Sequence, residues 1–137
     1  IRFLFQRLPA SELRELLVSL GQYLSRCHNQ GILHRDLSDG NLLVKKDSAG
    51  HFKFYFIDTN RVRVRRHLRL LKRVKNLIRL GVPPEHQRYF LKQYAGETRL
   101  GKFVWLWYRL NKMTYTHYVW LKKKLKLRRL SRKLKIQ

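Results

Sequence analysis

The most informative part of this chain is residues 31–44, which read GILHRDLSDGNLLV. The segment begins with a glycine, continues through a mostly polar run at residues 34–41, and ends in three apolar residues. A second apolar run at residues 52–57 follows a cluster of turn-forming residues, so the two runs are predicted to pair as a β-hairpin. Because a hairpin brings the chain back to the end where it started, Asn41 and Asp58 are predicted to flank the same end of this small sheet.

An amphipathic helix is predicted before this segment, from about Ser11 to His28. Apolar side chains recur there at helical spacing, at positions 13, 16, 17, 20, 23, 24 and 27. Ser11 stands where it can cap the start of the helix, and Gly31 can adopt the left-handed conformation that commonly ends one.

Two further helices are predicted after the hairpin. Residues 61–79 carry nine Lys or Arg and no acidic residue, and apolar residues recur at helical spacing at positions 70, 71, 74, 77 and 78, which predicts a cationic amphipathic helix. Residues 81–84 (GVPP) break it, Pro84 is predicted to begin the next helix, and Gly96 to end that helix. These elements predict a mainly α chain with a small β-hairpin, in the α+β class.

The candidate site consists of His34, Asp36, Asn41 and Asp58. Phosphoryl transfer requires a carboxylate that orients the acceptor hydroxyl and oxygen ligands for the magnesium that bridges the phosphates, and Asp36, Asn41 and Asp58 can supply that set. Each residue alone has an ordinary structural explanation, as a loop cap, a turn residue or a packed histidine. Taken together, the four residues follow one another in the expected order of a helix, a loop, a strand, a turn and a strand, and this order favours a catalytic site. His34 is interpreted as structural support for the loop.

Residues 31–44 and the run FYFIDTNRV at residues 54–62 resemble the catalytic loop and the metal-binding strand end (58–61) of the lipopolysaccharide core kinases. Those enzymes phosphorylate heptose or Kdo sugars and share the protein-kinase fold. The resemblance covers about residues 11–96 and implies the C-terminal lobe of a protein-kinase-like fold. By this resemblance Asp36, in the catalytic loop 34–41, is the catalytic base, and Asn41 and Asp58 are metal ligands.

The same resemblance implies the setting of the reaction. The protein would be a bacterial enzyme, cytoplasmic and peripheral at the inner face of the inner membrane, that uses ATP and Mg²⁺. Its acceptor would be a sugar hydroxyl, of heptose or Kdo, on the lipopolysaccharide core or a lipid A precursor.

The sequence departs from the family's pattern in several respects. Thr59 and Asn60 follow Asp58 where regulated protein kinases have Phe-Gly, an acidic residue is common at the position of Asn60, and Arg35 stands where Gly is frequent. No Gly-rich loop and no strand lysine of the kind that holds ATP phosphates precedes residue 31. We therefore expect a fragment that is inactive alone, with a kinase-like C-terminal lobe at residues 1–120 and a basic amphipathic tail at residues 121–137.

The balance of charge points to an anionic partner. The chain carries 32 Lys and Arg against 8 Asp and Glu, a formal net charge of +24, which no compact fold needs. Nine of the fourteen residues at 122–135 are basic and are interleaved with leucines, which predicts a cationic amphipathic helix. Each charge near an anionic inner leaflet contributes about 1 kcal/mol, and the candidate lipid contacts are Lys122, Lys123, Lys124, Lys126, Arg128 and Arg129.

Several alternatives stay open. The tail can instead be a solvated charged face, and the polybasic stretches permit a nucleic-acid-binding module, although nothing in them reads bases and nucleic acid is not the expected partner. A kinase-fold scaffold without activity is a third possibility.

Trp105, Trp107 and Trp120 are predicted to pack in the core rather than at a headgroup boundary. The single cysteine, Cys27, excludes an intramolecular disulfide.

Overall fold

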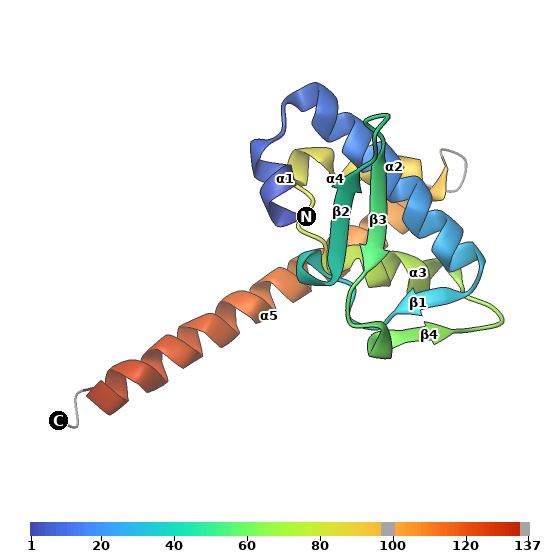
Figure 1. The fold of residues 1–137 in the computed structure, drawn as a ribbon. Helices are drawn as coiled ribbons and strands as arrows, with labels where there is room; N and C mark the ends of the chain where they lie inside the picture. The colour runs from blue at the N-terminus through green and yellow to red at the C-terminus, as the bar shows by residue number, and fades with distance from the viewer. Residues whose placement is uncertain (97–100, 135–137) are drawn as a thin grey trace.

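The computed structural model describes the backbone of residues 1–96 and 101–134, and the side chains in these ranges except at 2–3 and 127–134. Two small antiparallel sheets and the helices α1 (Arg2–Arg7), α2 (Ala10–Asn29), α3 (Leu70–Asn76) and α4 (Gln87–Ala95) form the body, together with the first part of α5 (Lys102–Leu134). The rest of α5 extends away from this body (Figure 1). The predicted class, mainly α with a small amount of β-structure, is confirmed.

Helix α2 is the central element of the core because its leucines lie on one face. The start of the helix differs from the prediction: Pro9 is the N-cap residue and Ser11 lies inside the first turn, so the prediction that Ser11 caps the helix is wrong. Gly31 follows the helix with φ at +77°, as predicted, and a Cβ atom there would overlap the carbonyl oxygen of Arg65. The fully buried leucines of α2 are Leu16, Leu17, Leu20 and Leu24.

The predicted β-hairpin is present as β2 (Leu42–Lys46) and β3 (Phe52–Phe56). Phe52 and Phe54 are buried while the residues that follow each of them are exposed, which is the alternation expected of a half-buried strand. Asp47 stabilises the turn, because its Oδ1 accepts the backbone N–H groups of Ala49 at 3.0 Å and of His51 at 2.9 Å. The hairpin covers one side of α2, as Figure 1 shows.

A second two-stranded sheet, absent from the sequence prediction, pairs β1 (Ile32–His34) antiparallel with β4 (Val62–Val64). The cationic helix predicted for residues 61–79 is therefore wrong over its first half. Only α3 is α-helical there, and a 3₁₀ turn at Leu77–Arg79 follows it. The β-branched Val62 and Val64 pair with β1 instead, because valines alternating with arginines have the period of a strand and the helical spacing begins only at Leu70.

The last two helices follow the predicted boundaries in part. Pro84 begins a 3₁₀ turn that leads into α4, and Gly96, with φ at +80°, ends α4 as predicted. Trp105 and Trp107 pack partly buried against the core, whereas Trp120 is 53% exposed, so the core prediction is wrong for Trp120. Val119 still lines a pocket with Phe5 and Gly81, so Trp120 is exposed because it lies on the outer side of α5, and the helix continues unbroken through residues 120 and 121.

Candidate active site

His34, the last residue of β1, joins the two polar segments of the candidate site. Its side chain is buried and its ring lies 5.3 Å, centre to centre, from that of Phe56. Nε2 donates a hydrogen bond to the carbonyl oxygen of Ile57 at 2.9 Å, which leaves Nδ1 to accept the backbone N–H of Asp36 at 3.3 Å. The imidazole ring of His34 therefore links the backbone of Asp36 to the backbone of Ile57, the residue before Asp58.

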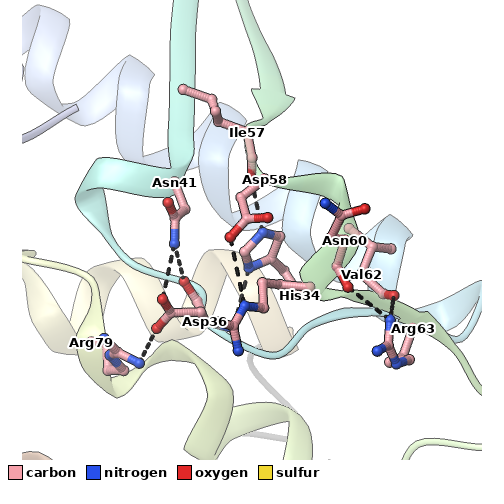
Figure 2. Close-up of polar contacts among 10 residues, drawn as sticks. His34, Asp36, Asn41, Ile57, Asp58, Asn60, Val62, Arg63 and Arg79 are labelled. Carbon is pink, nitrogen blue, oxygen red and sulfur yellow. Dashed lines mark hydrogen bonds and ion pairs between the residues drawn. The ribbon is translucent and has the colours of Figure 1, made fainter.

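Asp36 lies in the loop after β1 with its carboxylate between two partners (Figure 2). Nδ2 of Asn41 donates to the backbone carbonyl oxygen of Asp36 at 2.8 Å and to its Oδ2 at 3.3 Å. The guanidinium of Arg79 forms an ion pair with Oδ1. The Asp36 side chain is still 37% exposed, so a substrate can reach the carboxylate.

Asn41 and Asp58 lie at the same end of the β2–β3 hairpin. The backbone N–H of Ile57 donates to the carbonyl oxygen of Asn41 at 3.0 Å, which extends the strand pairing by one step. Asp58 has left-handed backbone angles, φ 57° and ψ 60°, and turns the chain out of β3. In Figure 2 the side chains of Asn41 and Asp58 extend from these strand ends toward the loop that carries Asp36. The Asp58 carboxylate lies 3.6 Å from Nε of Arg61.

The oxygen donors at this end of the hairpin suit a magnesium ion. The amide nitrogen of Asn41 is bonded to Asp36, so its Oδ1 is the atom that can face a cation, and Asp58 adds a carboxylate. Mg²⁺ prefers oxygen ligands and is commonly held by one or two side chains together with water and substrate phosphates. Across the described ranges, no three His, Cys, Asp or Glu side chains gather in a metal-binding group, so a magnesium ion here would also rely on substrate oxygens.

Arg79 is the contact of Asp36 that sequence reasoning missed. It lies in the 3₁₀ turn after α3, and Nζ of Lys112 on α5 donates to the carbonyl oxygens of its two neighbours, Ile78 and Leu80, at 2.6 Å each. Burial lowers the pKa of the Lys112 ammonium. Lys112 thereby holds the backbone on both sides of Arg79.

Asp39, a second residue not singled out from the sequence, fastens the catalytic loop to the same turn region. It is only 8% exposed, and its Oδ1 accepts the backbone N–H of Gly81 at 2.7 Å. A Cβ atom at Gly81 would overlap Oδ2 of Asp39, so a larger residue there would displace this carboxylate. Nothing local in the sequence marks these contacts, because each joins segments that are far apart along the chain.

A buried chain of hydrogen bonds supports the loop from behind. Nε of Arg73 donates to Oη of Tyr94 at 3.0 Å, and Oη donates to Nδ1 of His28 at 2.6 Å. Nε2 of His28 donates to Oδ1 of Asn76 at 3.2 Å, and Nδ2 of Asn76 donates to the carbonyl oxygen of His34 at 3.0 Å. This order requires a neutral His28, and burial, with Arg73 adding to it, lowers the pKa of that imidazole to about 4.

The predicted lipid-contacting lysines lie apart from this site. Lys122, Lys123, Lys124 and Lys126 are exposed on the part of α5 that extends from the body (Figure 1). Nζ of Lys124 lies 4.8 Å from the centre of the Trp120 ring. Arg128 and Arg129 lie outside the side chains that the structure describes. Among the described helices, none combines the length and the apolar character that crossing a membrane requires.

Short segments of this chain are similar to known proteins. Sperm motility kinase 1 of Mus musculus is 48% identical over 40 residues, which is 29% of this chain and 8% of that protein. Cell division control protein 2 homolog C of Antirrhinum majus is 45% identical over 42 residues, 31% of this chain and 14% of that protein. The matched segments thus span a small part of the length of these curated relatives. No solved structure matches the chain.

A match to a protein family covers much more of the chain. The model of the lipopolysaccharide kinase (Kdo/WaaP) family matches residues 4–95, which include Asp36, Asn41, Asp58 and Arg79. The resemblance inferred from the loop and strand-end motifs is confirmed by this match. The chain belongs to the lipopolysaccharide kinase (Kdo/WaaP) family.

Proposed function

We propose that this chain is part of a phosphotransferase that moves the γ-phosphoryl group of ATP to a sugar hydroxyl, of heptose or Kdo, in the lipopolysaccharide inner core. The proposal is carried by one arrangement: His34 holds Asp36 beside the hairpin end where Asn41 and Asp58 emerge. Membership of the Kdo/WaaP family and the partial match to protein kinases support the reaction class.

In this proposal Asp36 orients the acceptor hydroxyl and accepts its proton while the hydroxyl oxygen attacks the γ-phosphorus. Arg79 holds one carboxylate oxygen and Asn41 the other, so the side chain is oriented before the acceptor arrives. Phosphoryl transfer depends mainly on such positioning and on neutralising charge. A magnesium ion bound by Asn41 and Asp58 would supply that neutralisation at the phosphates of ATP.

We also propose that the chain acts as the C-terminal lobe of a two-lobed enzyme and is inactive alone. Kinases hold the ATP phosphates with a Gly-rich strand and a strand lysine, and residues 1–30 contain neither pattern. Activity should therefore be measured on the complete gene product.

The decisive experiment compares phosphoryl transfer by the wild type and by Asp36→Asn in the complete gene product, with a Kdo-bearing lipid A precursor and a heptose-bearing core as acceptors. We expect kcat to fall at least about a hundredfold, because the proton acceptor is lost. Glu15→Gln, an exposed carboxylate of α2 away from the loop, is the matched control and should keep wild-type turnover. Unchanged turnover in a folded Asp36→Asn protein would contradict the proposed role.

We further propose that α5 holds the enzyme at the inner face of the bacterial inner membrane. An exposed apolar stripe along α5 includes Phe103, Leu106, Leu110, Met113, Trp120 and Leu121. Residues 98–137 contain thirteen Lys or Arg and no carboxylate, so a second copy of this helix would repel the first, whereas an anionic lipid surface attracts it. Aromatic and lysine side chains next to one another, such as Trp120 and Lys124, suit a headgroup boundary.

Vesicle sedimentation tests this surface. We expect the chain to bind vesicles containing phosphatidylglycerol and not vesicles of phosphatidylcholine alone, since the attraction depends on lipid charge. Replacing Lys122, Lys123 and Lys124 by Gln should release the protein, while the same number of charges removed at Arg14, Lys45 and Arg88 should not. Equal release by both triple variants would contradict a specific α5 surface. Salt-sensitive binding of duplex DNA in preference to vesicles would support the nucleic-acid alternative instead.

A further inference from the structure

A cleft of about 370 Å³ lies between the β1–β4 sheet and α3, next to the loop of Asp36. We propose that this cleft binds a phosphate or carboxylate group carried by the acceptor sugar. The inference rests on the proposed phosphotransferase function and adds a second anchoring point for its substrate. The cationic lining residues are Arg35, Arg63, Arg65, Lys72, Lys75 and Arg79, and no acidic residue lines the cleft.

The sheet forms one wall of the cleft. In the antiparallel register of β1 and β4, Leu33 lies opposite Arg63. Side chains alternate along a strand, so Arg65 shares the face of Arg63, and Arg35 shares the face of Leu33. The ladder therefore places three guanidinium groups on one side of the sheet, where the cleft lies.

Helix α3 forms the opposite wall. Lys72, Lys75 and Asn76 are three and four residues apart, so they lie on one face of the helix. The Asn76 amide is engaged on both sides, with His28 and with the carbonyl oxygen of His34. The α3 wall of the cleft is thus part of the same hydrogen-bonded support that holds the catalytic loop.

The cations of the cleft are largely without counter-charges. Arg79 is paired with Asp36, and in the described part of the chain none of the other five lining cations forms an ion pair. The guanidinium of Arg63 is held instead by the carbonyl oxygens of Asn60 and Val62, at 2.8 Å each. Positive charges on two facing walls repel one another and destabilise the free protein, and a bound anion would relieve that repulsion through charge-assisted hydrogen bonds.

Two residues that line the cleft also adjoin Asp36, the proposed catalytic base. Arg35 directly precedes Asp36 in the chain, and Arg79 pairs with its Oδ1. An acceptor whose anionic group lies among these arginines can present a neighbouring hydroxyl to Asp36. The cleft is open on one side, and its volume is sufficient for one charged sugar.

Binding is tested by NMR titration of the 137-residue chain with Kdo, which carries a carboxylate, and with a heptose phosphate. Inorganic phosphate and glucose serve as the free anion and the uncharged sugar. We expect backbone amide shifts at residues 63–65 and 72–76 with the two anionic sugars, weaker binding of inorganic phosphate, and no binding of glucose. Binding of inorganic phosphate as tight as that of the anionic sugars would overturn the assignment to an acceptor.

The variant Arg65→Ala/Lys75→Ala removes one cation from each wall and is expected to weaken binding of the anionic sugars at least about tenfold. The control Lys45→Ala/Arg88→Ala removes the same charge from exposed positions outside the cleft and should change binding less than about twofold. Equal weakening by the two double variants would indicate a general charge effect and overturn the proposal.

A kinetic measurement separates this inference from the proposed function. In the complete gene product, Arg65→Ala/Lys75→Ala should raise KM for the acceptor at least about tenfold with little change in kcat, because the lost contacts are made before and during transfer alike. Unchanged KM would overturn the role of the cleft. Binding of sugars to the cleft needs no turnover, so an inactive wild-type enzyme that still binds them would contradict the phosphotransferase function and not the anion site.

Discussion

The guanidinium of Arg79 forms an ion pair with the carboxylate of Asp36 and so joins the 3₁₀ turn after α3 to the loop after β1. Lys112 of α5 holds the carbonyl oxygens on both sides of Arg79. The family match ends at residue 95, so the element that positions Arg79 lies outside the matched segment. The orientation of the candidate base thus depends on residues that its own loop motif does not contain.

Replacing Arg79 by Ala is expected to lower kcat of the complete gene product about tenfold, because Asp36 loses the partner of its Oδ1. Arg79→Lys should keep part of the activity, since it retains the charge without the planar geometry of the guanidinium. Both side chains of the pair are more than a third exposed, so the free energy of unfolding should fall by only about 0–1 kcal/mol. Initial rates and urea unfolding measure the two effects; unchanged kcat in Arg79→Ala would rule out this role.

His28 should make stability depend on pH. Burial lowers its pKa to about 4 in the folded chain, against 6.5 for an exposed imidazole. Between these values the unfolded chain binds a proton that the folded chain does not, so the free energy of unfolding falls as the pH drops from 6.5 toward 4, by up to about 1.4 kcal/mol per pH unit. Urea unfolding across this range should show a steeper fall for the wild type than for His28→Gln. Parallel curves for the two proteins would disprove the assignment.

Two buried tyrosines are expected to respond in opposite ways to loss of the hydroxyl group. Tyr94 is bonded to both Arg73 and His28, so Tyr94→Phe should lower the free energy of unfolding by about 1–3 kcal/mol. Oη of Tyr108 is buried and, within the described residues, has no hydrogen-bond partner. Tyr108→Phe should therefore be neutral or stabilising by up to about 1 kcal/mol. Thermal or urea unfolding of both variants is the measurement, and a large destabilisation by Tyr108→Phe would show that its hydroxyl is satisfied in solution.

Gly31, which precedes β1, should tolerate substitution less well than Gly50 in the hairpin turn. Gly31 and Gly50 both have positive φ, but a Cβ atom at Gly31 would overlap the carbonyl oxygen of Arg65, whereas the space around Gly50 is open. Gly50→Ala should lower the free energy of unfolding by about 1–2 kcal/mol, which is the cost of a positive φ in alanine without a steric overlap. Gly31→Ala should cost at least about 1 kcal/mol more, because the β1–β4 sheet must also move. Equal losses of stability in urea unfolding would refute the steric argument.

The loop and strand-end motifs could be found from the sequence because they depend on neighbours along the chain. The spacing of His34, Asp36 and Asn41 is set within one short loop, and the turn chemistry before β3 brings Asp58 back to the same end. The periodic leucines of α2 and the boundaries at Pro84 and Gly96 are likewise local signals. These features were sufficient to indicate the family and the candidate site residues.

The errors and omissions all involve contacts between distant segments. Residues 61–79 share one continuous positive charge, but helical spacing begins only at Leu70, and the first part pairs with β1 because that strand offers backbone partners. Trp120 is exposed because it lies on the outer side of α5, while its neighbour Val119 faces Phe5 and Gly81, an orientation that no window of sequence reveals.

Residue types and short-range spacing therefore determined which groups make up the candidate site and which elements carry them. The tertiary structure alone decided that Arg79 reaches Asp36, that Lys112 fixes that approach, and that six cations face one another across a cleft. The physical reason is range: helix and turn preferences act over a few residues, whereas ion pairs, sheet pairing and burial act between segments that only the packed core brings together.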